Sequence, residues 1–200
     1  MKNFKPYIMV LFSLWGFNST SQENFNGDLT DEEKNMLKVL REEEKLARDV
    51  YLYAYEKYGL PIFSNIGNSE QRHMDQVLFL LEQYGLEDPA LPKEGEFVNE
   101  ELQSLYDQLT SKVDLSLMDA LEVGATIEDL DIKDILEFIE DTDKAPIIDT
   151  FQRLECGSRN HMRAFISQIT SRGGNYKPQF ISPEMFRHII NSSHERCGRL

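Results

Sequence analysis

The sequence predicts an all-α protein built on four long helices, and three observations support this prediction. Apolar residues recur at steps of three and four over four long segments, which is the period of a helix. Glycine and proline residues stand near the ends of these segments, and no segment alternates apolar and polar residues as a strand would. With 200 residues and 40% hydrophobic side chains, the chain can bury the core of a single domain.

The first long helix is expected over residues 31–58. Thr30 and Glu33 have the spacing of a capping box at its start, and Gly59 and Pro61 end it. Its apolar residues share one stripe: Leu37, Leu40, Ala47, Tyr51, Ala54 and Tyr58. This stripe predicts an amphipathic helix with one face in the core.

The second long helix is expected over about residues 63–84, where Gly85 suits the position after a helix end. Residues 88–99 hold two prolines and a glycine and are expected to form a loop. A short helix is expected to follow over residues 100–109.

Ser116 is placed to cap a third long helix that extends to about residue 141. Pro146 suits the first turn of a fourth, which continues to residue 172 and ends at Gly173. Residues 181–200 are expected to form a C-terminal tail.

The links between the helices predict the topology. Short links join the first helix to the second and the third to the fourth, so each pair should be antiparallel. About 30 residues separate the second helix from the third, which is enough chain to run along the whole bundle. A four-helix bundle with one long crossover between helices two and three is the ferritin-like arrangement, and we expect it over residues 31–180.

The N-terminal residues have the pattern of a secretory signal peptide. Lys2 and Lys5 precede a short apolar run over residues 6–17, and small residues follow as far as Ser21. We expect cleavage after Ser21, a flexible lead-in over residues 22–30, and export to the periplasm or the exterior without a stable membrane span. The alternative is an uncleaved anchor, for which the apolar run is short.

The charge balance excludes some partners. The chain has 35 acidic and 21 basic residues and a net charge of −14, which would repel nucleic acids and anionic membranes. Its two cysteines, Cys156 and Cys197, could form one disulfide in an oxidising compartment, but the sequence leaves their pairing open.

Polar residues interrupt the apolar stripe of every long helix near its middle. They are Glu44, Glu70, His73, Glu128, Asp131, Ser158 and His161. A buried carboxylate is unfavourable unless it is paired, neutralised or bound to a metal. Glu70 and His73 also form a Glu-x-x-His motif, which directs both side chains to one face of a helix. We therefore predict a metal site whose ligands come from four helices.

Carboxylates with imidazoles suit iron or manganese, and di-iron bundles take one Glu from each of two helices and Glu-x-x-His from the other two. The fourth helix keeps His161 but has Ser158 in place of the Glu. Asp131 is therefore a candidate for the missing carboxylate, or else an ion-pair partner of Arg159 or Arg163. Glu43 is an alternative to Glu44, because the two flank the apolar centre of their helix from opposite sides.

Four stretches carry a resemblance to a family: EEEKLARDVY (42–51), NSEQRHMDQV (68–77), GATIEDLDIKD (124–134) and CGSRNHMRAF (156–165). They resemble an uncharacterised ferritin-like family of prokaryotes, a domain of unknown function related to rubrerythrin and ferritin. The resemblance implies a ferritin-like fold and metal ligands at Glu44, Glu70, His73, Glu128 and His161. It implies no known activity, and Ser158 departs from the usual bridging Glu.

The sequence thus predicts an exported protein with a di-iron centre that oxidises Fe(II) or reduces peroxide or O2, as an oxidoreductase does. Manganese or zinc are the other candidate metals, and a homodimer is a candidate assembly. Two alternatives stay open: a site for a single metal ion, and a metal-free helical module whose buried polar groups form a hydrogen-bonded network.

Overall fold

The structure, a computed structural model, describes residues 27–198 and folds them into helices alone. The helices are α1 (Asp31–Tyr58), α2 (Pro61–Gln83), α3 (Glu100–Val113), α4 (Leu117–Glu140), α5 (Ala145–Ser171) and α6 (Pro183–Asn191). The all-α prediction is confirmed. The predicted signal peptide and most of the predicted lead-in lie outside the described residues.

The predicted helix ends are close to the observed ones. Thr30 and Glu33 form the reciprocal capping box at the start of α1, and Gly59 ends that helix with a φ of 62°. The structure differs at α2, which begins at Pro61 because a proline in the first turn gives up no intrahelical hydrogen bond. The short helix α3 also extends beyond residue 109 to Val113.

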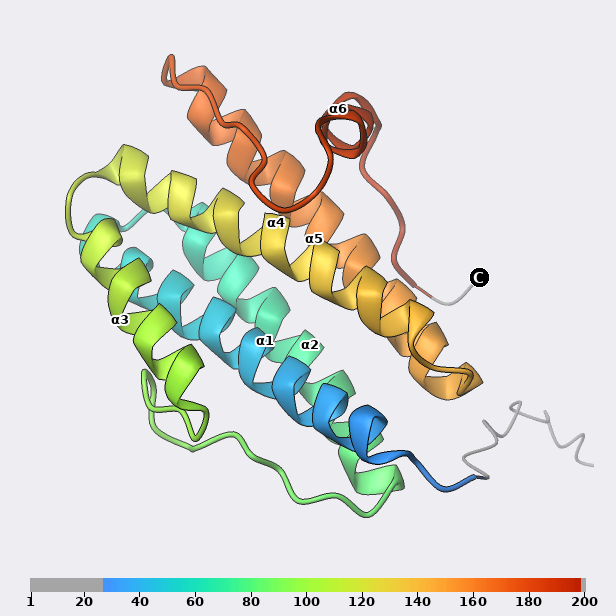
Figure 1. Ribbon diagram of the computed structural model, residues 1–200. Coiled ribbons are helices and arrows are strands. Elements are labelled where there is room, and N and C mark those ends of the chain that lie inside the picture. The colour runs from blue at the N-terminus through green and yellow to red at the C-terminus, as the bar shows by residue number, and fades with distance from the viewer. Residues whose placement is uncertain (1–26, 199–200) are drawn as a thin grey trace, which may run out of the picture.

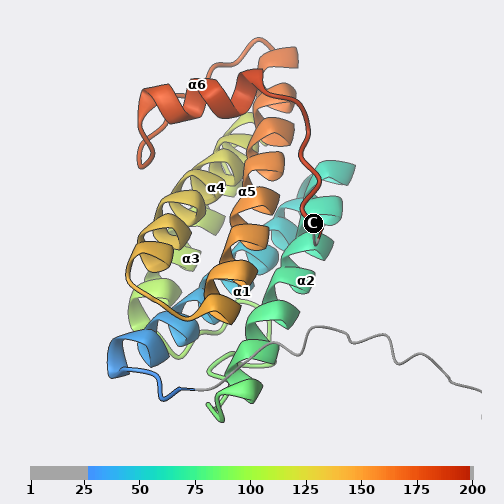
Figure 2. The ribbon, with the colours of Figure 1, turned by 90° about the vertical axis from the view of Figure 1, so that its right-hand side faces the viewer.

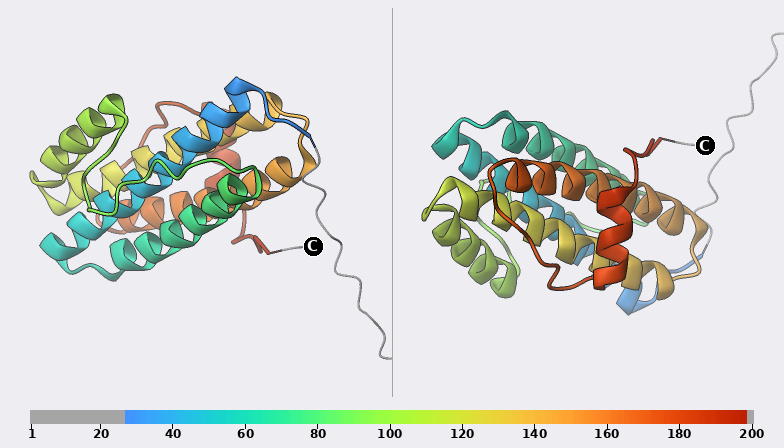
Figure 3. Two further views of the ribbon diagram at one scale, coloured as in Figure 1. Left: turned by 90° about the horizontal axis from the view of Figure 1, so that it is seen from below. Right: turned by 90° about the horizontal axis from the view of Figure 1, so that it is seen from above.

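The four long helices lie side by side (Figures 1 and 2). The helix α1 packs along α2, and α4 packs along α5; α1 also contacts α4, and α2 contacts α5. The chain between α2 and α4 includes α3, which packs against α1 and α4. The two opposite views of Figure 3 show the start of this connection on one face of the molecule and α6 on the other.

Buried charged groups of α1 fasten the long connection. Lys45 and Asp49 are 2.5 Å apart and fully buried, and they bond to the backbone of the connection at Lys93 O and Gly95 N. Glu42 likewise accepts a hydrogen bond from the amide of Val98. The connection is thereby fixed along α1 by hydrogen bonds as well as by packing.

The apolar core is divided into two clusters. One contains Leu37, Leu40, Val77, Leu80, Ile135, Phe151 and Leu154, and the other contains Ala47, Val50, Tyr51, Phe63, Ile66, Leu121, Phe165 and Ile169. On α1, Glu44 stands between Leu40 of the first cluster and Ala47 of the second; on α5, His161 stands between Leu154 and Phe165. On α1, α2 and α5 the buried Glu and His residues thus stand between the two clusters, whereas on α4 Ile127 and Ile132, on either side of Glu128, belong to the same cluster.

A disulfide joins Cys156 of α5 to Cys197 and ties the C-terminal tail to the helices, which resolves the pairing that the sequence left open. None of the described helices is both long enough and apolar enough to cross a membrane.

Candidate metal centre

Five buried Glu and His side chains from the four long helices converge in the interior. Glu44 comes from α1, Glu70 and His73 from α2, Glu128 from α4 and His161 from α5. They form two groups, Glu44–Glu70–His73 and Glu70–Glu128–His161, and the ligand atoms of each group lie within 4.8 Å of one another. Glu70 belongs to both groups, so the two candidate positions share one carboxylate.

The distances show how Glu70 joins the two groups. In the first, Nδ1 of His73 lies 2.8 Å from Oε2 of Glu70 and 3.2 Å from Oε2 of Glu44. In the second, Nδ1 of His161 lies 2.8 Å from Oε1 of Glu70 and 3.4 Å from Oε2 of Glu128. Each oxygen of Glu70 therefore faces a different imidazole, as a carboxylate that bridges two ions would require.

Three buried polar atoms of these residues have no hydrogen-bond partner, which bears on whether the residues suit a metal. Oε1 of Glu44, Oε1 of Glu70 and Nδ1 of His161 are buried and have no hydrogen-bond partner, although buried polar atoms nearly always have one. The Glu70 and His161 atoms are close to each other but lack the angles of a hydrogen bond. Oxygen and imidazole nitrogen atoms are ligands that suit iron and manganese, so the residues fit a transition-metal centre.

The electrostatics of the metal-free site favour protonated imidazoles. Burial disfavours a charged ring, but the facing carboxylates Glu70 and Glu128 outweigh it and raise the pKa of His161 to about 10. Glu44 and Glu70 likewise raise the pKa of His73 well above its usual value. Burial raises the pKa of Glu44 to about 7, against the effect of His73. Without a metal these raised pKa values favour protonated imidazoles, so metal binding would displace protons from the site.

Neighbouring residues position these side chains. The fully buried hydroxyl of Tyr51 donates to Oε1 of Glu128 at 2.5 Å, which leaves Oε2 directed at His161. Gly157 lies against the ring of His73, so close that it leaves no room for a Cβ atom. Sequence reasoning missed Gly157, because a glycine within a helix carries no sign of what packs against it.

Asp131 and Ser158 pair with each other beside the two groups. The buried Ser158 hydroxyl lies within hydrogen-bond distance of Asp131 and of the carbonyl oxygen of Leu154, and its single proton can serve either acceptor. Asp131 belongs to neither Glu/His group. The two arginines that the sequence offered as its partners, Arg159 and Arg163, both bind Glu195 of the C-terminal tail instead.

Glu43 lies apart from both groups as well. Its Oε2 atom is buried without a hydrogen-bond partner, and burial together with Asp134 and Glu44 raises its pKa to about 8. Of the two adjacent glutamates considered from the sequence, the structure brings Glu44 to the histidines and directs Glu43 into a neighbouring apolar cavity.

A second cavity, of about 310 Å³, reaches the centre between α2 and α5. Its inner wall includes His73 and His161, and its outer wall includes His194, Glu195 and Cys197 of the tail. The disulfide and the two ion pairs of Glu195 hold the tail at this opening. The tail therefore borders the route by which small molecules would reach the imidazoles.

Comparisons with known proteins identify the family of this chain. Residues 33–193 match the family described as "Uncharacterized protein domain (DUF2202)". "Uncharacterized protein MJ0754" of Methanocaldococcus jannaschii is 52% identical over 169 residues, which are 84% of this chain and 91% of that protein. The crystal structure of hypothetical protein MJ0754 from Methanococcus jannaschii DSM 2661 matches with a TM-score of 0.83 and 50% identity, covering 84% of this chain and 97% of that one.

Proposed function

We propose that this chain, which belongs to the DUF2202 family of uncharacterised protein domains, holds a two-metal redox centre within a ferritin-like four-helix bundle. The observation that carries the proposal is the position of Glu70, which directs one oxygen to each of two buried imidazoles. One further carboxylate completes each candidate metal position: Glu44 in the first group and Glu128 in the second. Ferritin-like bundles take inward-facing ligands from all four helices in this way.

Iron is the metal we propose. The three carboxylates and two imidazoles are ligands that suit iron or manganese, and the two groups contain none of the thiolates that are common in structural zinc sites. A pair of irons would supply one-electron steps to O2 or peroxide, or would turn over Fe(II) as a substrate.

The chain's own residues define what such a centre can do. His73 and His161 line the cavity that opens to the solvent, so a small molecule would arrive on the imidazole side. The opposite side is closed by packing, since Tyr51 is fully buried and its ring lies 5.3 Å from that of Phe165. Tyr51 also holds one oxygen of Glu128 by a hydrogen bond, which fixes the orientation of that carboxylate. These features favour a small oxidant over a bulky substrate.

Metal content is the first test. We expect about two ions per chain in protein expressed from residue 22 in iron-rich medium. Glu44→Ala and Glu128→Ala should each retain about one ion, and Glu70→Ala should lose most of both, because Glu70 serves both groups. Glu56→Gln, on an exposed part of α1, is the matched control and should retain both ions. A folded, metal-free wild-type protein would overturn the proposal.

A single-ion centre is the second candidate, and Ser158 favours it. Ser158 stands on α5 one turn before His161, where a second bridging carboxylate would be, and its hydroxyl is already bonded to Asp131. One ion per chain in the wild type, lost equally in Glu44→Ala and Glu128→Ala, would select this candidate over the two-metal centre.

Export is a further part of the proposal. The disulfide between Cys156 and Cys197 supports an oxidising compartment, where such bonds persist. Cell fractionation together with N-terminal sequencing of the mature protein tests this, and we expect a start at Gln22. An intact N-terminus in the cytoplasmic fraction would contradict it.

A further inference from the structure

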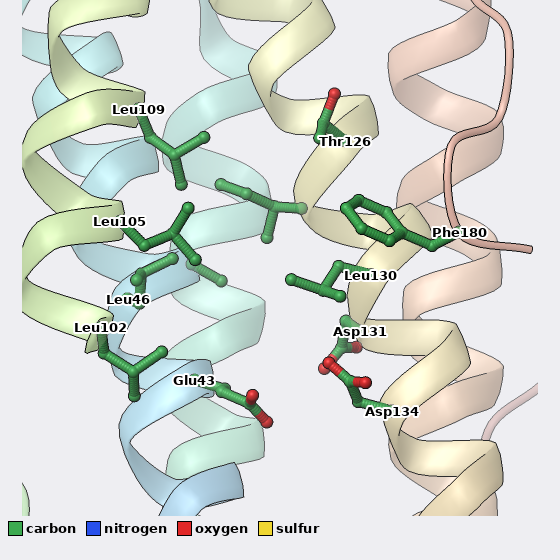
Figure 4. Close-up of a pocket in the computed structure, with 12 residues that line it drawn as sticks. Glu43, Leu46, Leu102, Leu105, Leu109, Thr126, Leu130, Asp131, Asp134 and Phe180 are labelled. Atoms are coloured by element: carbon green, nitrogen blue, oxygen red, sulfur yellow. The ribbon is translucent and has the colours of Figure 1, made fainter. Parts of the chain in front are cut away.

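A cavity of about 70 Å³ lies between α1, α3, α4 and the segment before α6 (Figure 4). Most of its wall is apolar: Leu46, Ala47, Leu102, Leu105, Leu109, Ile127, Leu130 and Phe180. Three carboxylates, those of Glu43, Asp131 and Asp134, stand together at one end. The cavity is thus apolar along its length and acidic at one end.

The acidic end has more acceptors than donors. Oε2 of Glu43 is buried and has no hydrogen-bond partner. Figure 4 shows this carboxylate directed across the cavity toward Asp131 and Asp134. Asp131 accepts one bond from Ser158 and Asp134 one from Lys133, and neither donor serves Glu43. A buried acceptor in this setting favours a ligand that brings donors and positive charge.

The spacing of the carboxylates favours an organic cation over a metal ion. Within residues 27–198, three ligand atoms come within 4.8 Å of one another only in the two Glu/His groups, and Glu43, Asp131 and Asp134 form no such set. Metal–oxygen bonds of about 2.0–2.6 Å need that closeness, whereas N–H···O bonds of about 2.7–3.2 Å span wider oxygens. An ammonium group presents three such donors.

The rim of the cavity is held in place by another buried carboxylate. Asp129, with no exposed surface, accepts hydrogen bonds from the Tyr176 hydroxyl and from the amides of Phe180 and Ile181. These bonds fix Phe180 beside the cavity while its side chain is 43% exposed. Phe180 is therefore held at the wall of the cavity in the folded chain.

We propose that this cavity binds a short aliphatic primary amine as its ammonium ion, with the nitrogen among Glu43, Asp131 and Asp134 and the alkyl chain along the leucines. An alkyl amine is protonated at neutral pH, as the Lys side chain is. A cavity of this volume takes about three to four non-hydrogen atoms, at roughly 20–25 Å³ each, the rate at which benzene fills a cavity of about 150 Å³. The proposal is independent of the metal centre, because none of its five Glu and His residues lines the cavity.

Three probes of equal chain length test the proposal: n-propylamine, propan-1-ol and propanoate. Binding to the full mature chain is measured by NMR chemical-shift titration, before and after removal of metal with a chelator. We expect propylamine to bind at least tenfold more tightly than propanol, and propanoate not to bind, in both preparations. Equal affinities for the amine and the alcohol, or no binding of the amine, would overturn the proposal.

Variants locate the site. Glu43→Gln should lower the ratio of amine affinity to alcohol affinity at least tenfold. Leu105→Trp, which fills the cavity from α3, should abolish binding of both the amine and the alcohol. Glu56→Gln on the exposed face of α1 is the control and should leave both affinities unchanged. Unchanged amine affinity in both cavity variants would overturn the proposal. Metal analysis of every variant reports separately on the proposed redox centre.

Discussion

A Cβ atom at Gly157 would lie 2.6 Å from Nε2 of His73, a separation that real contacts do not reach. The close approach of α5 to the histidine of α2 therefore requires glycine at this position. The ring cannot move aside freely, because Nδ1 faces Glu70 and Glu44 on its other side.

We therefore expect Gly157→Ala to displace His73 and weaken metal binding at the first group. The overpacking should also lower the free energy of unfolding by about 1–3 kcal/mol. Elemental analysis and urea unfolding measure the two effects. Gly198→Ala, which adds a methyl group in open space, is the control. Full metal content in Gly157→Ala would contradict the placement of His73.

Tyr51→Phe should weaken the second group without emptying the first. It removes the hydrogen bond to Glu128, a buried bond to a charged group worth about 1.5–3 kcal/mol. Loss of such an orienting partner typically lowers metal affinity about 10–100-fold. Competition with a chelator measures the affinity, and Tyr55→Phe, at a half-exposed position, should leave it unchanged. Equal affinities in Tyr51→Phe and the wild type would mean that the hydroxyl has no part in the site.

The metal-free protein should lose stability as the pH rises. The pKa of His161, raised to about 10 in the folded chain, is above its unfolded value of about 6.5, so its stabilising charge is present below pH 6.5 and is lost toward pH 10. Glu44 acts in the same direction at lower pH, because its pKa rises to about 7 on folding. Urea unfolding of chelator-treated protein from pH 6 to 9 measures the slope.

His161→Gln separates this contribution from the other ionisable groups, and its slope over the same range should be shallower than that of the wild type. With metal bound the sign should reverse, since protons compete for the imidazoles and acid releases the ion. A metal-loaded protein whose stability does not fall on acidification from pH 7 to 5 would show that the imidazoles are not ligands.

Reduction of the disulfide should make the candidate metal centre more accessible to solutes. The bond closes a sequence separation of 41 residues, and its loss should lower the free energy of unfolding by about 2–4 kcal/mol. Because the tail borders the cavity that ends at His73 and His161, a chelator should remove the metal faster once the bond is broken. The rate is measured for the wild type and Cys197→Ser, each with and without reductant. A reductant effect that persists in Cys197→Ser would have another cause.

Much of the helical framework and the five converging Glu and His residues could be predicted from the sequence. Apolar periodicity fixes which face of each helix is buried, and Glu44, Glu70, Glu128 and His161 interrupt those faces. Their convergence could be predicted because a buried polar group needs a polar partner, and the inward faces of the other helices offer such partners.

Other features depend on contacts that periodicity does not encode. Glu43 and Glu44 are about 100° apart on the helix, and only the packing of α3 decides that Glu43 faces an apolar cavity. Asp129 has no apolar stripe to interrupt, yet it is fully buried because the segment before α6 folds over it. The tail reaches Arg159 and Arg163 through contacts more than 30 residues apart in the sequence.

The buried Glu and His side chains of the candidate metal centre also restrict how the helices align lengthwise. A shift of one helix by a single turn, about 5.4 Å, would move its carboxylate or imidazole among leucines and phenylalanines and leave its partners uncompensated. Leucine-rich surfaces alone would tolerate several such alignments. We therefore expect the same side chains that would hold a metal to favour one register of the four helices during folding, before any ion is bound.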